Sequence, residues 1–293
     1  LRAVMDSFNE PKRFLLGEVF GDYKEIKGYV GNGYNRLHLA FLFDMLNFKF
    51  SADYFRQKVA EREQHFPAPY MPVYVFSNHD RKRSISRMGN DVRKAKMLAA
   101  FQLTVRGVPV VYMGEEIGMQ QAKIPVAEAK DPLAIKYNWI PQWLINMSAE
   151  SINRDECRTP VQWTAGPNAG FTDSTATPWL PVHECYPTVN VAAAKADTHS
   201  LWQVYRALLS LRNATPALHS GQLQLIDEAA LPKGVLAYDR VSGEQRYRIW
   251  LNFGSKTRSI ELPQGAEVVY SIYALPEQSS VLLVPQQAVI CKL

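Results

Sequence analysis

The chain has no long hydrophobic run and few cysteines. No uninterrupted apolar segment approaches the roughly 18 to 20 residues needed to span a bilayer, so we expect no membrane span. Cys157, Cys185 and Cys291 show no CxxC or Cys/His spacing of a zinc site. We interpret them as reduced thiols rather than disulfides. The sequence therefore predicts a cytoplasmic protein without a metal or other cofactor.

A strong excess of one charge is also missing. The 33 basic residues exceed the 28 acidic ones by only five, and the densest basic run, residues 81–83, is typical of a solvated loop. We therefore expect no nucleic-acid partner. With 293 residues, 47% of them hydrophobic, the chain is long enough for one large domain and a smaller one.

Apolar runs alternate with helical patterns in the first part of the chain. Buried strands are predicted at residues 14–16, 73–76 and 108–112, while residues 37–45 fit a strand or a helix. Helices are predicted at residues 55–66, 91–106 and 200–213, and Ser51 is a suitable N-cap for the first. This alternation is typical of parallel α/β units.

The later part of the chain has a different character. Residues 118–198 are irregular and rich in Pro, Trp and Asn, which is typical of a long functional loop. Short β-like segments separated by turn residues follow from about residue 221 to the end. We expect residues 1–220 to form the α/β domain and residues 221–293 to form an all-β, antiparallel, sandwich-like domain.

Two carboxylates follow predicted strands, where α/β enzymes place their active sites. Glu18 follows the first strand, and Asp80 follows the strand at residues 73–76. Paired carboxyl groups at neighbouring strand ends suit glycoside hydrolysis, which needs an acid and a second carboxylate. Their positions alone fit ordinary strand-end carboxylates as well. Glu115 and Glu116 follow the last predicted strand, and we expect a structural role for them.

Longer motifs favour the catalytic interpretation. Residues 16–19 (LGEV), 77–80 (SNHD) and 107–119 (GVPVVYMGEEIGM) resemble, in order, regions of glycoside hydrolase family 13, the α-amylase family. Residues 154–163 (RDECRTPVQW) and 167–171 (PNAGF) resemble its α-glucosidase, oligo-1,6-glucosidase and trehalose synthase branch. The resemblance covers about residues 1–220. It implies the C-terminal half, strands 5–8, of a (β/α)8 TIM barrel.

The resemblance also implies a role for each matching residue. Glu18 matches the general acid/base, and Asp80 matches the carboxylate that stabilises the oxocarbenium-like transition state. His79 matches a histidine that hydrogen-bonds the same sugar ring, although histidines at strand ends are often structural. Arg154 is similar to an arginine that closes the non-reducing-end pocket; an ion pair with Asp155 or another acidic loop residue is the alternative.

The resemblance lacks one essential part. The family's nucleophile is an aspartate in a Gly-x-Arg-x-Asp segment, and no such segment occurs here. Strands 5–8 alone would also leave open sheet edges. We therefore expect a piece of a longer protein, or a chain completed by the missing N-terminal half or by a second copy. The family's calcium site relies partly on absent segments, so no metal is assigned.

The resulting prediction is a retaining α-glucosidase-type hydrolase or transglycosylase that acts on small α-glucoside oligosaccharides. The 293-residue chain alone, which lacks the nucleophile, is expected to be inactive. The alternative is a non-catalytic binding or scaffold subunit that resembles the family. Linkage specificity is not predicted. Trp163, Trp179 and Phe171 could stack on sugars, although loop aromatics more commonly pack the loop itself.

Overall fold

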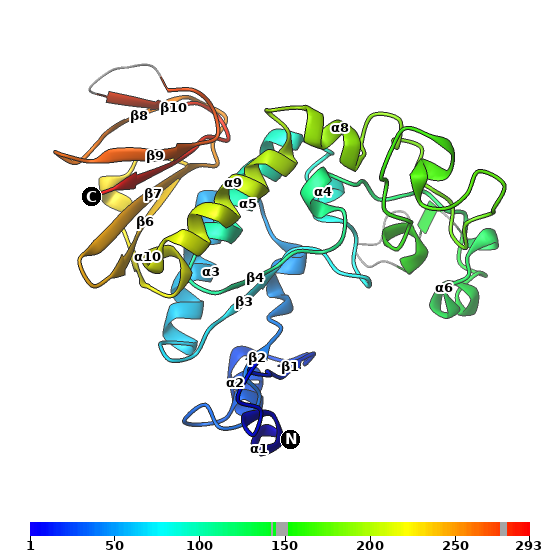
Figure 1. The fold of residues 1–293 in the computed structure, drawn as a ribbon, viewed down its shortest axis with the longest axis horizontal. Helices are drawn as coiled ribbons and strands as arrows, with labels where there is room; N and C mark the ends of the chain where they lie inside the picture. The colour runs from blue at the N-terminus through cyan, green and yellow to red at the C-terminus, as the bar shows by residue number, and fades with distance from the viewer. Residues whose placement is uncertain (142, 145–151, 276–279) are drawn as a thin grey trace. The chain divides into compact units, whose positions relative to one another are not determined.

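The computed structural model describes residues 1–141, 143–144, 152–275 and 280–293 (Figure 1). The chain forms two compact units. Unit 1 contains Leu1–Val75, Met97–Val110 and Ala207–Leu293, and unit 2 contains Phe76–Lys96 and Val111–Arg206. Among the described helices, none has the length and apolar character needed to cross a membrane.

Unit 1 contains two pairs of parallel strands. β1 (Leu16–Gly17) pairs with β2 (Leu39–Ala40), and β3 (Val73–Val75) pairs with β4 (Val108–Val110). Helices separate the successive strands in the chain: α2 (Tyr23–Val30) follows β1, α3 (Ala52–His65) follows β2, and the short α4 (Ser84–Arg87) and the longer α5 (Val92–Thr104) follow β3. The predicted strand–helix alternation is confirmed, and residues 37–45 form β2 and the 3-10 helix η1 (Phe43–Asn47).

Side-chain caps explain where two of these helices begin. The Ser51 hydroxyl accepts a hydrogen bond from Tyr54 N at 3.3 Å, which confirms the predicted N-cap of α3. The start of α2 is a capping box, in which Asp22 and Glu25 each accept from the other's backbone N–H. α2 is not predicted from the sequence, although Ile26 and Val30 are spaced for one helix face and both are buried.

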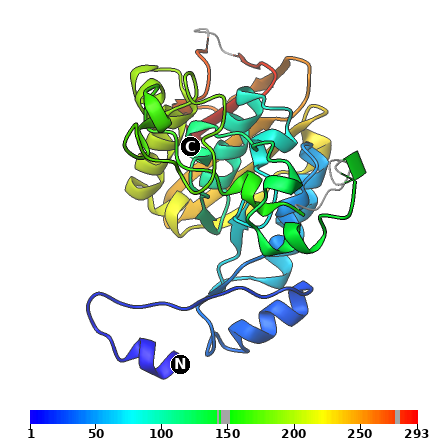
Figure 2. The same ribbon diagram turned by 90° about the vertical axis from the view of Figure 1, so that its right-hand side faces the viewer.

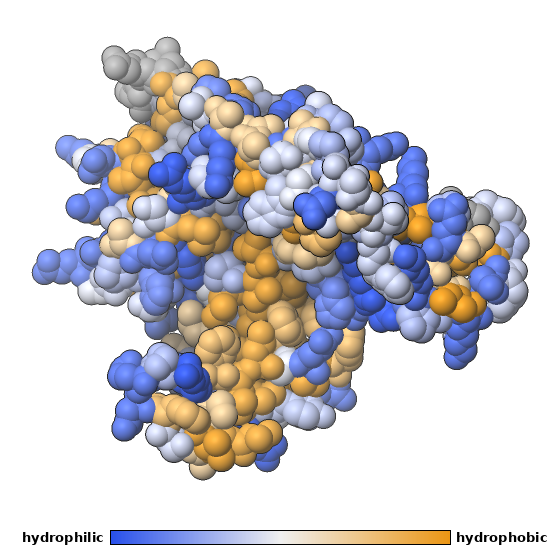
Figure 3. All heavy atoms as spheres, turned by 45° about the vertical axis from the view of Figure 1, so that its right-hand side comes forward, coloured by the Kyte–Doolittle hydropathy of each residue, from blue (hydrophilic) through white to orange (hydrophobic). Residues whose placement is uncertain are grey.

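The first strand is exposed, contrary to the prediction that it is buried. Phe14, Leu16 and Phe20 are 64%, 39% and 67% exposed, and β1 pairs only with β2 in the part of the chain that the structure describes. The N-terminal part of unit 1 is the blue ribbon at the bottom of Figure 2, and hydrophobic residues reach the surface at the bottom of Figure 3. A small core lies beside β2: Ile26, Val30, Ala40, Leu42, Phe66 and Tyr70.

The predicted C-terminal strands are confirmed as antiparallel. The larger sheet has the order β5-β6-β7-β11-β9, and a second sheet pairs β8 with β10. Their bounds are β5 (Gln222–Leu225), β6 (Val235–Ser242), β7 (Gln245–Asn252), β8 (Arg258–Glu261), β9 (Glu267–Ser271), β10 (Ser280–Leu283) and β11 (Ala288–Lys292). β5 is a further strand that the pattern does not predict.

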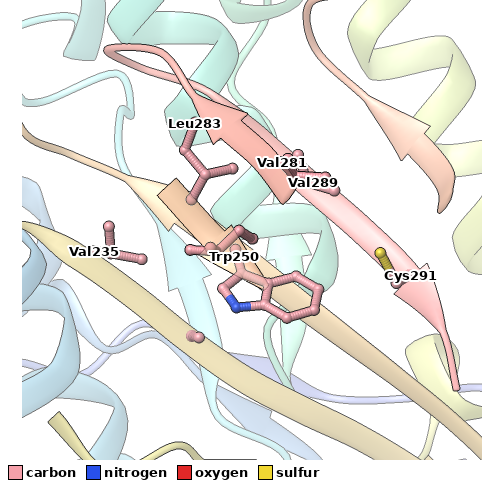
Figure 4. Packing of buried hydrophobic residues seen from close by; sticks show 8 residues of the cluster. Val235, Trp250, Val281, Leu283, Val289 and Cys291 are labelled. Carbon is pink, nitrogen blue, oxygen red and sulfur yellow. The ribbon is translucent and has the colours of Figure 1, made fainter. Parts of the chain in front are cut away.

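Side chains from both sheets form one hydrophobic core (Figure 4). Trp250 on β7 is its largest member and packs in a cluster with Val281 and Leu283 from β10 and with Val289 from β11. Residues of the two sheets are therefore buried together, as expected for a sandwich-like arrangement.

The other face of β6 is buried as well. Leu236 and Tyr238 are fully buried, and the Tyr238 hydroxyl hydrogen-bonds Thr104 Oγ1 at the end of α5. Two buried arginines donate to nearby carbonyls at the same helix end, Arg240 to Thr104 O and Arg212 to Leu103 O. A positive charge is favourable at a helix C-terminus, so these contacts fix α5 to the C-terminal part of unit 1.

Unit 2 is built from short helices and long connections. Its predicted irregular stretch is confirmed for the described residues, while residues 142 and 145–151 lie outside them. The remaining elements among the described residues of both units are α1 (Arg2–Asp6), η2 (Glu115–Ile117), η3 (Val126–Glu128), α6 (Pro132–Lys136), η4 (Arg154–Cys157), η5 (Pro167–Gly170), α8 (Val191–Ala196), α9 (Leu201–Ala214), α10 (Pro216–His219) and η6 (Glu228–Ala230).

Candidate active site

Asp80 lies in a tight turn a few residues after β3. The Asn78 side chain accepts a hydrogen bond from Asp80 N at 3.0 Å, and a bridge between Asn78 and Arg81 closes the turn. The Asp80 side chain is 28% exposed, and its Oδ2 lies 3.6 Å from Nε2 of His79, whose side chain is 55% exposed. The turn therefore presents a partly exposed carboxylate beside an exposed imidazole.

Two arginines bind one oxygen of Asp80. Arg154 Nη1 and Arg158 Nη2 both donate to Asp80 Oδ1, at 3.1 and 2.9 Å. Arg158 Nε also donates to the His79 carbonyl at 2.7 Å, so one guanidinium fixes two consecutive residues of the turn. Both contacts are charge-assisted hydrogen bonds, which hold this oxygen in place. The second oxygen, Oδ2, is the one that the arginines do not engage.

A second carboxylate binds the other side of Arg154. Arg154 Nε and Nη2 donate to Oδ2 and Oδ1 of Asp131 at 2.8 and 2.7 Å, which is a bidentate ion pair. The Asp131 side chain is fully buried. Arg154 therefore forms the ion pair with an acidic loop residue that is the alternative to a sugar contact in the sequence-based prediction. The partner is Asp131 rather than Asp155. Arg154 also binds Asp80 at the same time.

Asp155 has a separate function in this cluster. Its Oδ2 accepts hydrogen bonds from the backbone N–H groups of Lys130 and Asp131, at 2.6 and 3.0 Å. In the opposite direction, Asp131 Oδ2 accepts from Arg154 N at 2.9 Å. The segments at residues 130–131 and 154–155 therefore bind each other, since each contributes a carboxylate that accepts hydrogen bonds from the backbone of the other.

The Asp131 ion pair makes stability depend on pH. Burial alone would raise the pKa of Asp131, but hydrogen bonds from Arg154 outweigh it and lower the pKa from 3.8 to about 2. A carboxylate with a lowered folded-state pKa stabilises the fold above its unfolded pKa and loses this contribution as pH falls through the folded value. The difference in unfolding free energy between wild type and Asp131→Asn should therefore shrink as pH falls from 3.8 toward 2. Urea denaturation at several pH values measures it, and a constant difference would contradict this expectation.

A buried layer lies under the turn. Cys157 Sγ donates to the His79 carbonyl at 3.4 Å, and burial raises the pKa of this thiol to about 11, so it stays protonated at neutral pH. Arg83 is also buried and donates to the carbonyls of Met113 and Cys157. The prediction that residues 81–83 form a solvated loop is thus wrong for Arg83, because these carbonyls offer buried hydrogen-bond acceptors.

Glu115 supports the same turn. Its Oε1 accepts from the hydroxyls of Ser77 and Ser84 at 3.0 and 2.7 Å, and its Oε2 accepts from Tyr112 N. Burial raises the pKa of Glu115, and the hydrogen bonds act against it. A buried carboxylate whose contacts hold the turn after β3 supports the predicted structural role.

Glu18 belongs to unit 1. It directly follows β1 and is exposed, as are Leu16 and Phe20 on either side at alternate positions. Leu15, Gly17 and Val19 between them are half-buried. Glu18 therefore faces the exposed side of the segment, together with two apolar side chains. Its convergence with Asp80, which lies in unit 2, stays a prediction.

The structure thus brings together His79, Asp80 and Arg154 of the predicted residues. It adds Asp131 and Arg158, for which no role is predicted from the sequence. Arg158 lies in the motif at residues 154–163, and its charge four positions after Arg154 was the available signal. Asp131 precedes Pro132 at the start of α6; this signal indicates a helix N-cap but not an ion pair with Arg154.

Aromatic side chains are also exposed in unit 2. Trp163, Phe171 and Trp179 are 48%, 49% and 74% exposed. Lys130 lies over the Trp179 ring, with Nζ 4.1 Å from its centroid, and also donates to the Trp179 carbonyl. Within the described ranges, no group of three or more His, Cys, Asp or Glu side chains is placed to hold a metal ion.

Comparison with known proteins connects this geometry to a family. Residues 1–221 match the alpha-amylase family described as "Alpha amylase, catalytic domain". A probable alpha-glucosidase of Rhizobium meliloti (strain 1021) is 33% identical over 273 residues, which are 89% of this chain and 46% of that protein. An oligo-1,6-glucosidase of Parageobacillus thermoglucosidasius is 35% identical over 200 residues, which are 64% of this chain and 35% of that protein.

Solved structures show the same likeness. The trehalulose synthase MutB from Pseudomonas mesoacidophila MX-45 has a TM-score of 0.79 and 28% identity, covering 94% of this chain and 55% of that one. An inactive MutB double mutant in complex with isomaltulose has a TM-score of 0.83 and 27% identity, covering all of this chain and 58% of that one. The chain spans about half the length, or less, of the relatives it matches.

Proposed function

Since the chain belongs to the alpha-amylase catalytic-domain family, we propose that it forms the C-terminal part of a retaining α-glucosidase-type enzyme. The substrates would be small oligosaccharides with α-glucosidic bonds, cleaved by water or transferred to an acceptor sugar. The observation that carries this proposal is the cluster of His79, Asp80 and Arg154, whose residues match the family motifs in order. Two similar structures were solved in complex with isomaltulose and sucrose.

We propose further that β1 to β4 are the last four strands of a (β/α)8 barrel. Two features support this: the parallel pairing within β1/β2 and β3/β4, and the exposed apolar residues beside β1. The missing half of the barrel would cover the exposed apolar residues beside β1. It would also supply the nucleophilic aspartate that the resemblance implies. A longer polypeptide, a separate chain or a second copy could provide that half.

In this mechanism Glu18 donates a proton to the glycosidic oxygen as the bond breaks. It then takes a proton from the water or acceptor sugar that attacks the glycosyl-enzyme intermediate. Glu18 ends up protonated again, so each cycle leaves it unchanged. Its exposed position after β1 and its match to the family's LGEV motif support this role.

Asp80 has a different role in the proposed mechanism. Two arginines fix its Oδ1, while Oδ2 can accept hydrogen bonds from sugar hydroxyls. A fixed negative charge stabilises the positive charge that develops on the sugar ring in the transition state. His79, beside Oδ2, would donate to a hydroxyl of the same ring. No metal or cofactor is needed for any of these steps.

The domain boundary near residue 220 and a cytoplasmic location also stay proposals. The free thiols of Cys157, Cys185 and Cys291 support the cytoplasmic location.

The direct test of function is glucose release from maltose, isomaltose, sucrose and trehalose by the intact native polypeptide that contains this chain. Release from at least one of them supports the proposal. No release or transfer with any α-glucoside would instead favour a non-catalytic binding or scaffold subunit.

A further inference from the structure

Arg154 is held on two sides by carboxylates of different exposure. Asp80 is partly exposed, whereas the Asp131 side chain is completely buried. A fully buried carboxylate cannot reach a sugar, so any effect of Asp131 on catalysis must pass through its partners. Its side chain accepts three hydrogen bonds from Arg154. We infer that Asp131 is the positioning residue that orients Arg154 toward Asp80; this inference rests on the proposed function.

The planar guanidinium explains how the orientation is transmitted. Asp131 binds Nε and Nη2, which lie along one edge of the group. Because the guanidinium is rigid, fixing this edge also fixes the direction of Nη1. Nη1 is the atom that donates to Asp80 Oδ1. A guanidinium without the Asp131 partner would keep the single contact at Asp80 but lose its fixed plane.

Asp131 is itself held by the protein backbone. Asp155 accepts hydrogen bonds from the backbone N–H groups of Lys130 and Asp131, while Leu133 N donates to Asp131 Oδ1 at 3.1 Å. The resulting chain of contacts runs from Asp155 through the backbone to Asp131, then to Arg154 and Asp80. Each link has ordinary hydrogen-bond geometry.

The charges give a second reason for this role. Asp80 contacts two arginines, Arg154 and Arg158. Asp131 supplies the second negative charge, so that two carboxylates face two guanidinium groups. Without Asp131, one of the two positive charges would be unbalanced beside Asp80. This excess would oppose the positive charge that develops on the sugar during bond cleavage.

The test uses kcat/KM of the intact native polypeptide on the best α-glucoside. Asp131→Asn keeps the size of the side chain and removes the charge, and it should lower kcat/KM about 10-fold or more. Asp91→Asn is the matched control, because Asp91 also pairs with an arginine, Arg93, but outside the cluster. The control should stay within about 2-fold of wild type.

A double-mutant cycle separates positioning from general stability. If Asp131 acts through Arg154, Asp131→Asn should cost less than about 3-fold in an Arg154→Ala background. Guanidinium at about 50 mM should partly restore Arg154→Ala, because Asp131 and Asp80 can bind the free ion, but should not restore Arg154→Ala/Asp131→Asn. Additive losses, equal rescue of both variants, or an Asp131→Asn variant as active as the control would overturn the inference.

A substitute variant covers misfolding of Asp131→Asn, and the activity of wild type separates failure of the proposed function from failure of the positioning role. If Asp131→Asn does not fold, Asp131→Glu replaces it in the same cycle, since it keeps the charge but moves it by one methylene. If wild type releases or transfers no sugar from any α-glucoside, the proposed function fails. If wild type is active and the losses are additive, the positioning role alone fails.

Discussion

Replacing Glu18 with glutamine is expected to lower kcat on maltose or isomaltose by about 10²- to 10⁴-fold, the usual contribution of a general acid/base. Glutamine has almost the same shape but cannot donate the proton that the leaving sugar requires. The loss should be smaller in the bond-breaking step with an aryl α-glucoside, whose leaving group needs little protonation. Steady-state and burst kinetics on both substrates measure the difference.

A second experiment identifies the role of Glu18 rather than its importance. With Glu18→Ala, azide should accelerate turnover of the aryl substrate by attacking the glycosyl-enzyme intermediate without needing a general base. The product of the retaining route is the α-glucosyl azide. Glu10→Gln, at an exposed carboxylate of the same N-terminal region, should leave kcat unchanged. A Glu18→Gln variant with near-normal kcat would remove Glu18 from the mechanism.

Replacing Asp80 with asparagine is expected to reduce kcat/KM by about 10²- to 10³-fold, because a charge that stabilises the transition state is lost. Arg154 and Arg158, at 3.1 and 2.9 Å, would then lack the negative charge that they now bind. Unfolding in urea should distinguish a catalytic effect from misfolding. Asp91→Asn serves as the control for an arginine-paired aspartate outside the cluster.

The two arginines also allow a rescue experiment at this position. In Asp80→Ala, formate should partly restore activity, because the guanidinium groups of Arg154 and Arg158 can bind its carboxylate near the vacated position. Rescue by formate but not by chloride would indicate a carboxylate requirement. An Asp80→Asn variant with more than about a third of wild-type kcat/KM would contradict the proposed electrostatic role.

The sequence predicts local structure well where one strong signal is enough. Ser51 marks the start of α3, and the apolar runs at residues 73–76 and 108–112 contain β3 and β4. β3 is buried as predicted, whereas β4 is only half-buried, contrary to the prediction. The alternating β segments after residue 221 become antiparallel strands. In each case the signal lies within a few residues of the feature it predicts.

Predictions that depend on distant partners are less complete. The apolar run at residues 14–16 predicts a buried strand, but burial depends on neighbouring strands, and β1 has a single partner among the described residues. Likewise, Arg154 has an adjacent acid, Asp155, yet it pairs with Asp131, 23 positions earlier. An irregular loop has no periodicity from which such a pairing could be inferred.

The site was predicted through motifs rather than spacing. Glu18 and Asp80 alone fit ordinary strand-end carboxylates, and only the ordered family motifs assign them roles. For Asp80 the structure supplies a physical basis, because the guanidinium groups of Arg154 and Arg158 both hydrogen-bond its Oδ1. It adds less for Glu18, whose proposed function depends on a surface that another part of the protein would have to cover.

The most direct test is an experimental structure of the intact polypeptide carrying Glu18→Gln, with isomaltose or maltose bound. We expect residue 18 within about 3 Å of the glycosidic oxygen and Asp80 Oδ2 at the same distance from hydroxyls of the adjoining glucosyl ring. Arg154 should still be paired with Asp131. A sugar bound elsewhere, or residues 18 and 80 facing separate surfaces, would contradict the proposed active site.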